Sequence, residues 1–192
     1  MKRLNLMVDI DEVLFPLGDS IHALAHEAGL HDNSEPWLMW EAYLQYGCEP
    51  DVYWDLWGDF AAAGGYAHTP PIPGSVEALR HLYFEGHTIN LVTARGFMKN
   101  AENIRRWTPE WIEEFAVPHH TLTFAKDKVA AQAELGAYDV AIDDSPKNYL
   151  ALEDAGVNVW MQTHSHNQAF DATCRVRDVW QWAAIVDKVA AS

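Results

Sequence analysis

Cysteine and basic side chains are both scarce in this sequence of 192 residues. Its two cysteines, Cys48 and Cys174, lie far apart and form no CxxC motif, so no disulfide framework is indicated and reduced thiols are expected. Only 13 Lys and Arg residues oppose 28 Asp and Glu residues, which gives a formal net charge of −15. A chain of this charge lacks the broad basic surface that long nucleic acids and anionic membranes require.

Long apolar runs are also missing. No run approaches the roughly 20 residues of a transmembrane helix. The N-terminal stretch reaches Asp9 before the apolar core of a signal peptide is complete. We therefore expect a soluble, cytoplasmic protein that contacts no membrane.

What the sequence does contain is enough apolar material for a substantial core. Hydrophobic residues make up 49% of the chain, and nine of them are tryptophans. Such a composition argues against wholesale disorder. The length suits one domain of ordinary size, or a core domain with a small inserted cap.

The chain is organised around residues 4–14, which read LNLMVDIDEVL. A continuous apolar run is typical of a parallel strand buried on both faces. This run ends in two carboxylates, Asp9 and Asp11. In open α/β sheets, chemistry takes place in the crevice beyond the carboxyl ends of the strands, and paired carboxylates are costly to bury there unless they bind a metal or a partner.

Strand and helix patterns alternate along the rest of the chain, which predicts an α/β fold with a Rossmann-like, doubly wound, mostly parallel sheet. Further strands are expected at 89–92, 121–124, 138–142, 157–161 and 174–176. Helices are expected at 19–28, 35–46, 51–63, 76–85, 97–107, 109–115, 128–135, 148–155 and from 178 onward, with Ser75 as the N-cap of the fourth. No strand is expected within 17–66. We therefore predict a core domain of residues 1–16 and 67–192, with a small helical cap, 17–66, inserted after the first strand.

The predicted cap is rich in aromatic side chains. Tyr53, Trp57 and Phe60 follow i, i+4, i+7 spacing, which places them on one helical face. Packing within the cap is the main use expected for these rings. A cap closing over a site would also be able to present one or two rings to a flat base.

Polar residues follow four of the predicted strands. They are Asp9 and Asp11, Thr93, Lys126 and Lys128, and Asp143 and Asp144. Each group alone is explained by a turn or a solvated strand end. Their joint placement at the carboxyl end of one sheet is much harder to attribute to chance, so it favours an active site there.

The sequences DIDEVL, LVTAR, KDK and IDDSP resemble the four motifs of the haloacid dehalogenase-like hydrolase superfamily, over essentially the whole chain. PPIPGSVEAL and the spacing from KDK to IDD are similar to the cytosolic 5′(3′)-deoxyribonucleotidase branch. The VTAR and DDSP motifs are shared with the phosphatase halves of polynucleotide end-processing enzymes.

This resemblance implies catalytic roles for four residues, and their chemistry agrees with it. Asp9 would attack phosphorus, and Asp11 would act as general acid and base, for which its pKa should lie above that of an ordinary Asp. Thr93 would hold a phosphoryl oxygen, and a lysine would neutralise charge there. The resemblance favours Lys128 for this lysine and Lys126 for a second substrate contact, whereas spacing alone does not separate the two.

A divalent cation is expected at the same place, because the carboxylates would otherwise repel a phosphate. Oxygen ligands and a phosphate substrate indicate Mg²⁺. The resemblance implies that Asp9, the backbone carbonyl of Asp11 and one carboxylate of Asp143 and Asp144 bind it. Which member of the Asp143 and Asp144 pair touches the metal stays open.

Four other positions carry weaker signals. Glu12 departs from the family pattern, which usually has Gly there, and so implies a backbone conformation that tolerates a Cβ atom or an extra carboxylate near the metal. Arg95 follows Thr93 and Ala94 and serves either as a substrate contact or as a surface ion-pair partner. His164 and His166 form a faint metal-ligand pattern, but a solvated loop is the favoured interpretation.

The first functional hypothesis is a Mg²⁺-dependent phosphomonoesterase that acts through an aspartyl-phosphate, with a (deoxy)nucleoside monophosphate as substrate. Ala94, Arg95 and Lys126 are the expected substrate contacts. One alternative is another small phosphate ester or a nucleic-acid 3′-phosphate end, and a second is a nucleotide-binding protein without activity. No long nucleic acid is expected as partner, and a homodimer is a candidate assembly.

Overall fold

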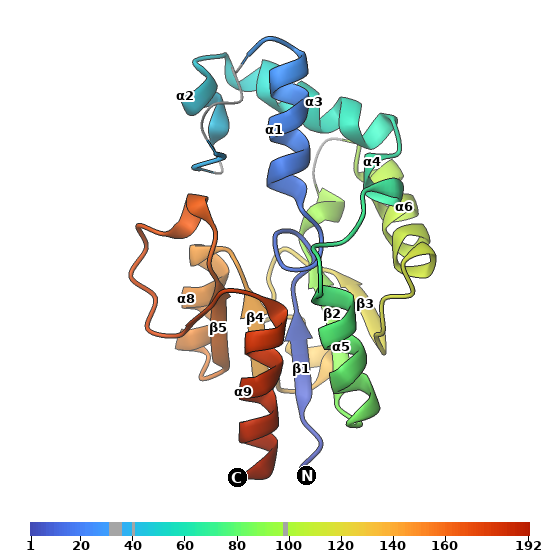
Figure 1. The fold of residues 1–192 in the computed structure, drawn as a ribbon, viewed down its shortest axis with the longest axis vertical. Helices are drawn as coiled ribbons and strands as arrows, with labels where there is room; N and C mark the ends of the chain where they lie inside the picture. Colours follow the sequence, from blue (N-terminus) through green and yellow to red (C-terminus); the bar gives the residue numbers. More distant parts are fainter. Residues whose placement is uncertain (31–35, 40, 98–99) are drawn as a thin grey trace.

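The protein is built on one parallel sheet of six strands (Figure 1). The computed structural model describes residues 1–30, 36–39, 41–97 and 100–192. The strand order is β3-β2-β1-β4-β5-β6, and every neighbouring pair is parallel. The strands are β1 (Asn5–Val8), β2 (Thr88–Thr93), β3 (Thr121–Phe124), β4 (Val140–Asp143), β5 (Asn158–Gln162) and β6 (Arg175–Val176). The predicted doubly wound α/β fold is confirmed.

Helices cover both faces of this sheet and extend beyond one end of it. Between β1 and β2 lie α1 (Leu17–Glu27), α2 (Ala42–Tyr46), α3 (Pro50–Ala62), α4 (Gly65–His68) and α5 (Ser75–Phe84). The remaining helices are α6 (Ala101–Glu114), α7 (Gln132–Leu135), α8 (Pro146–Asp154) and α9 (Val179–Ala191), with short 3-10 turns η1 (Arg95–Phe97) and η2 (Ser165–Asn167). In Figure 1, α1 to α4 lie beyond the end of the sheet that is opposite both chain termini.

The alternation of side chains along β1 divides the core into two clusters. Leu6 and Val8 pack on one face with apolar residues of α5, α6 and α9, whereas Met7 packs on the other face with residues of α8. All three side chains are fully buried. The apolar run of β1 is therefore explained by burial on both faces.

The first cluster continues into the helical segment between β1 and α5. Phe15 stacks on Tyr66 with ring centroids 5.7 Å apart and meets Trp111 of α6 edge to face at 5.5 Å. Tyr53, Trp57 and Phe60 of α3 are buried in the same cluster. The predicted one-sided face of α3 is confirmed, and its rings share a core with the sheet.

The helix predicted at 35–46 is wrong in part, because residues 36–39 are not helical and only α2 forms, while 35 and 40 lie outside the described residues. The Gln45 side chain explains this difference. Its Oε1 accepts from Leu38 N–H at 3.0 Å, and its Nε2 donates to the Pro36 carbonyl at 2.8 Å. These bonds satisfy one N–H and one carbonyl of a non-helical segment by a side chain, in place of helical backbone bonds.

Three other boundary predictions are corrected. The two helices expected at 97–107 and 109–115 form the single helix α6 with Pro109 inside it, since Ile104, Trp111 and Ile112 are buried along one side. Residue 97 belongs to η1, and 98–99 lie outside the described residues. Ser75 is the first residue of α5 and not its N-cap; its hydroxyl donates to the Ile72 carbonyl. Of the helix expected at 128–135, only α7 forms as α-helix.

Within the described residues, no helix is long and apolar enough to span a bilayer.

Candidate active site

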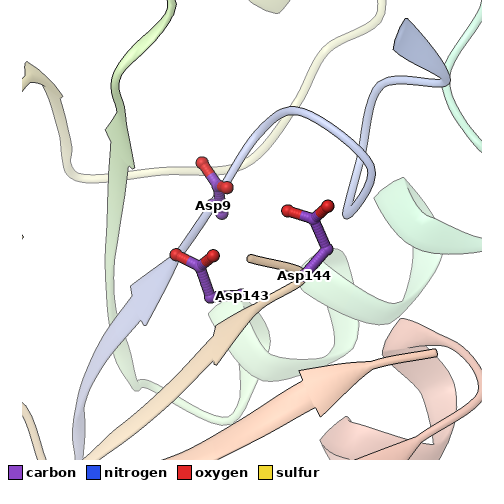
Figure 2. Close-up of side chains that lie close together, drawn as sticks. All are labelled: Asp9, Asp143 and Asp144. Carbon is purple, nitrogen blue, oxygen red and sulfur yellow. The ribbon is translucent and has the colours of Figure 1, made fainter. Parts of the chain in front are cut away.

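Two neighbouring strands bring three carboxylates together. β1 pairs with β4 in register Val8 to Ile142, and Asp9 N–H donates to the Ile142 carbonyl at 3.1 Å, so Asp9 lies beside Asp143 and Asp144. One oxygen from each of the three carboxylates lies within 4.8 Å of the others, and all three residues are buried. Figure 2 shows the three side chains converging on a common space from the ends of these strands.

Lys128 provides the positive charge of this cluster. Its Nζ lies 2.7 Å from Asp9 Oδ1 and 2.6 Å from Asp143 Oδ2, and the residue is 3% exposed. Burial alone would lower the pKa of Lys128, but the charges of Asp143 and Asp9 outweigh it and hold the pKa above its ordinary value. The structure thus separates the two lysines of the KDK motif, because Lys126 is exposed.

Asp143 and Asp144 differ in their remaining binding capacity. Both oxygens of Asp143 are occupied, by Lys128, by the Asn148 side-chain amide and by the Ser145 N–H. Asp144 accepts from His166 through Oδ2 at 2.8 Å, while no hydrogen bond to its Oδ1 is found among the described residues. Asp144 lines the adjoining cavity and Asp143 does not.

The donor set fits a hard divalent cation. Burial, together with the neighbouring carboxylates, raises the pKa of Asp9 and of Asp144 well above the ordinary value, although Lys128 opposes the shift. Three buried carboxylates close together oppose one another's ionisation, and Lys128 offsets part of their charge. A dication with oxygen preference would relieve this repulsion.

Asp11 and Arg95 form a buried, bidentate ion pair. Arg95 Nη2 and Nε donate to the two carboxylate oxygens of Asp11 at 2.5 Å and 3.1 Å. The guanidinium also lies over the Phe15 ring, at 4.5 Å, and the Tyr66 ring, at 5.0 Å. Of the two interpretations of Arg95, the surface ion pair is wrong, since its side chain is 0% exposed.

Thr93 ends β2 beneath the surface of the site. It is fully buried, and its hydroxyl accepts from Arg95 N–H at 3.2 Å. The exposed Ala94 and the buried Arg95 line the cavity at this point. Lys126 also lines the cavity, with its Nζ 5.3 Å from the centre of the Phe97 ring.

These residues surround a cavity of about 300 Å³, the lower end of the range for small-molecule sites. Asp9, Asp11, Ala94, Arg95, Lys126, Lys128 and Asp144 line it, as the sequence predicted for a single site, and Leu17, Trp57, Ser145, Lys147 and Asn148 complete the lining. None of these last five was among the predicted site residues, although Trp57 is one of the cap rings from which one or two base contacts were expected. Lys147 and Asn148 directly follow the IDDSP motif at the start of a helix. This position next to a predicted site motif is the sequence feature that would have indicated them as cavity residues.

Glu12 occupies a left-handed backbone conformation, with φ 59°. This conformation costs roughly 1–2 kcal/mol for a residue with a Cβ atom. Its carboxyl Oε1 accepts from Gly18 N–H in the first turn of α1 at 2.6 Å. Burial first, and Asp144 next, raise the pKa of Glu12 well above its usual value. The backbone therefore keeps the conformation that favours Gly, and the side chain supplies a helix cap in return.

The solvated loop expected around His164 and His166 is wrong. The side chain of His166 is 0% exposed and that of His164 is 23% exposed. Their rings stack with centroids 5.5 Å apart. Burial lowers the pKa of each to about 4, and for His164 the neighbouring His166 adds to the effect. Both histidines contact residues of the site: His164 bonds to the Glu12 carbonyl, and His166 bonds to the Asp144 carboxylate.

Comparison with protein families gives one match across nearly the whole chain. Residues 3–191 match the family described as "5′ nucleotidase, deoxy (Pyrimidine), cytosolic type C protein". A curated protein of Chlorobaculum tepidum, named "Putative 5′(3′)-deoxyribonucleotidase", is 34% identical over 88 residues. That match covers 45% of this chain and 41% of the relative, so it spans less than half the length of either protein.

Solved structures resemble the fold across its full extent. A haloacid dehalogenase-like family hydrolase from Streptococcus pneumoniae has a TM-score of 0.64 at 12% identity, covering 96% of this chain and 98% of that one. A "predicted phosphoglycolate phosphatase" from Haemophilus somnus also has a TM-score of 0.64, at 15% identity, covering 97% and 99%. At these identities the likeness concerns the fold.

Proposed function

Because the chain belongs to the cytosolic type C 5′-nucleotidase family, we propose that it is a Mg²⁺-dependent phosphomonoesterase acting on (deoxy)nucleoside monophosphates. The sequence resemblance to haloacid dehalogenase-like hydrolases and their deoxyribonucleotidase branch is confirmed by this membership and by the fold. Family membership also supports the class of phosphoric monoester hydrolase. The observation that carries the proposal is the buried cluster of Asp9, Lys128 and Asp144 at the wall of the cavity.

Asp9 is the proposed nucleophile. One carboxylate oxygen forms a bond to phosphorus while the ester P–O bond breaks, which leaves an aspartyl-phosphate and a free alcohol. Oδ1 of Asp9 accepts from Lys128 and also from the Ile10 N–H at 2.7 Å, so Oδ2 is the oxygen we assign to the attack. Lys128 would offset the negative charge that gathers around phosphorus.

Asp11 is the proposed general acid and base. It would give a proton to the leaving alcohol oxygen and later take one from the water that attacks phosphorus, releasing phosphate and regenerating Asp9. Both oxygens of Asp11 are acceptors in the ion pair with Arg95. A protonated Asp11 therefore requires Arg95 to shift, and the substrate phosphate is the anion that would attract it.

Mg²⁺ would be held by Asp9, the backbone carbonyl of Asp11 and Asp144. Of the two neighbouring aspartates, Asp144 has an oxygen, Oδ1, for which no hydrogen bond from another described residue is found, and it lines the cavity, so we assign direct binding to it. Asp143 would orient Lys128, to which it lies 2.6 Å away. When bound, the cation would neutralise phosphate charge and polarise the phosphoryl oxygens.

The helical segment between β1 and α5 is the proposed cap, with residues 17–66 as its extent and 1–16 and 67–192 as the core domain. Leu17 and Trp57 bring apolar surface from this segment to the cavity, which Lys126 and Lys147 also line. A lining that combines apolar and cationic side chains suits a base joined to a sugar phosphate. Thr93 and Ala94 would support the phosphate from the end of β2.

The two alternatives remain testable beside this proposal. Another small phosphate ester, or the 3′-phosphate end of a nucleic acid, would use the same chemistry, but the net charge of −15 disfavours a long polynucleotide. A nucleotide-binding protein without activity would bind tightly and release no phosphate.

Phosphate release from a panel of nucleoside 5′- and 3′-monophosphates, with Mg²⁺ and with EDTA, tests the proposal. We expect release that requires Mg²⁺ and differs among bases. Asp9→Asn should lower kcat by at least a thousandfold while leaving the circular dichroism spectrum unchanged, since it removes the nucleophile and one charged metal ligand but keeps the shape of the side chain. Cleavage of an aryl phosphate but of no nucleotide would retain the phosphatase and reject the nucleotidase, and wild-type turnover by Asp9→Asn would reject the mechanism.

A further inference from the structure

The segment of residues 162–167, which follows β5, touches both loops that carry the proposed metal ligands. It contains Gln162 at the end of β5 and the 3-10 turn η2, and it reads QTHSHN. Gln162, His166 and Asn167 have almost no exposed side-chain surface. The sequence motifs assign no role to this segment.

Its first pair of contacts reaches the loop after β1. Gln162 Nε2 and His164 Nε2 both donate to the Glu12 carbonyl, at 3.0 Å and 2.5 Å. The Glu12 N–H in turn donates to the Phe15 carbonyl at 2.8 Å. In a trans peptide the preceding carbonyl points opposite to this N–H. The Asp11 carbonyl, a proposed metal ligand, is thereby directed away from Phe15.

Its second pair of contacts reaches the loop after β4. Asn167 Nδ2 donates to the Asp144 carbonyl at 2.8 Å, and His166 Nε2 lies 2.8 Å from Asp144 Oδ2. The backbone and the carboxylate of the same residue are thus held at once. Oδ1 is the Asp144 oxygen that remains for a cation.

The segment is itself held in place by contacts with other elements, so it can fix the positions of the groups that it binds. Asn167 Nδ2 also donates to the Gln162 carbonyl at 2.8 Å, which closes the turn. Arg175 of β6 donates to the Asn167 carbonyl at 2.9 Å. The ring of Trp37, from the helical segment, packs on His166 with centroids 4.5 Å apart.

We propose that residues 162–167 position the metal ligands, with His166 selecting Oδ1 of Asp144 for the cation and with Gln162 and His164 fixing the loop that carries the Asp11 carbonyl. This inference rests on the proposed Mg²⁺ site. His166 and His164 act as positioning residues, because their hydrogen bonds go to the groups that hold the ligands. Removing such supporting contacts typically weakens metal binding about 10- to 100-fold.

The test is the dissociation constant of Mg²⁺, measured by isothermal titration calorimetry on the full chain without substrate. We expect His166→Ala to weaken binding about tenfold or more. His166→Gln, whose amide can still donate to Asp144, should recover most of the affinity. The matched control is His81→Ala, which removes a distant histidine–aspartate contact, 3.0 Å to Asp187, and should lower Tm without changing Mg²⁺ affinity.

Each outcome bears on one proposal. Wild-type protein that binds no Mg²⁺ would remove the metal from the proposed function. Binding by the wild type with unchanged affinity in His166→Ala would overturn the positioning role while leaving the function intact. Should His166→Ala fail to fold, His164→Ala removes one of the two donors to Glu12; it must weaken Mg²⁺ binding severalfold, and equal affinity overturns the inference.

Discussion

A single residue, Glu12, links the strand-end loop to the helices above it. Its carboxylate accepts from the Gly18 N–H of α1 at 2.6 Å, while its carbonyl is held by Gln162 and His164 from the other side. The backbone at this position is left-handed, with φ 59°. The side chain therefore compensates a strain that Gly would not have, and the two effects can be separated by substitution.

Glu12→Ala and Glu12→Gly both lose the bond to Gly18, but only the Ala variant keeps the left-handed strain. We expect Glu12→Ala to be less stable than Glu12→Gly by roughly 1–2 kcal/mol, as measured by urea unfolding in EDTA. Glu113, an exposed position inside α6, is the matched control. There the order should reverse, with Ala more stable than Gly by about 1 kcal/mol. Equal stability of the two Glu12 variants would contradict the strained conformation.

At the scale of whole elements, the sequence predicted the strands better than the helices. The apolar runs that became β1, β2 and β4 are buried on both faces, so composition alone identifies them. Local rules predicted that a helix would start at Pro109. Helix α6 instead continues through this residue, because its buried face includes residues both before and after the proline. Tertiary packing overrides local preference at that point, and no sequence pattern reports it.

The candidate site likewise has a part that the sequence predicted and a part that it did not. Residues placed at strand ends by the sequence meet around one cavity, because parallel strands end at one edge. The roles of Gln162, His166 and Asn167 were not predictable. Their partners Glu12 and Asp144 lie between 22 and 150 residues away, and only the folded sheet brings them together.

Helix α3 contributes one face to both the core and the cavity. Trp57 is 2% exposed, packs against Tyr53 at 5.8 Å and lines the cavity, while Trp54 is 38% exposed and is not part of the lining. If the ring contacts the base, Trp57→Phe should raise KM for a nucleoside monophosphate several-fold and leave KM for ribose 5-phosphate nearly unchanged. Trp54→Phe is the control. Equal changes for both substrates would assign Trp57 to packing alone.

Protonation couples the site to the stability of the whole molecule. Burial raises the pKa of Asp9, Glu12 and Asp144, so without metal the folded state holds more protons than the unfolded state above the ordinary values of 3.8 and 4.5. This excess makes stability fall as pH rises. The pKa values of His87, His164 and His166 are lowered, so these histidines make stability rise with pH. They do so only below their ordinary value of 6.5. Above 6.5 the opposing contribution of the histidines has ended.

Mg²⁺ should therefore stabilise the protein more at high pH than at low pH, because it competes with protons for Asp9 and Asp144. At a concentration of 100 times Kd, the gain is about 2.7 kcal/mol, which corresponds to roughly 5–10 °C in Tm for a chain of this size. We expect the Tm difference between Mg²⁺ and EDTA to be larger at pH 8 than at pH 5.5. In EDTA alone, the raised pKa values of the carboxylates should make Tm fall as pH rises. Asp144→Asn removes one titrating ligand and should reduce both trends, whereas a Tm difference independent of pH would show that the bound cation displaces no protons from these carboxylates.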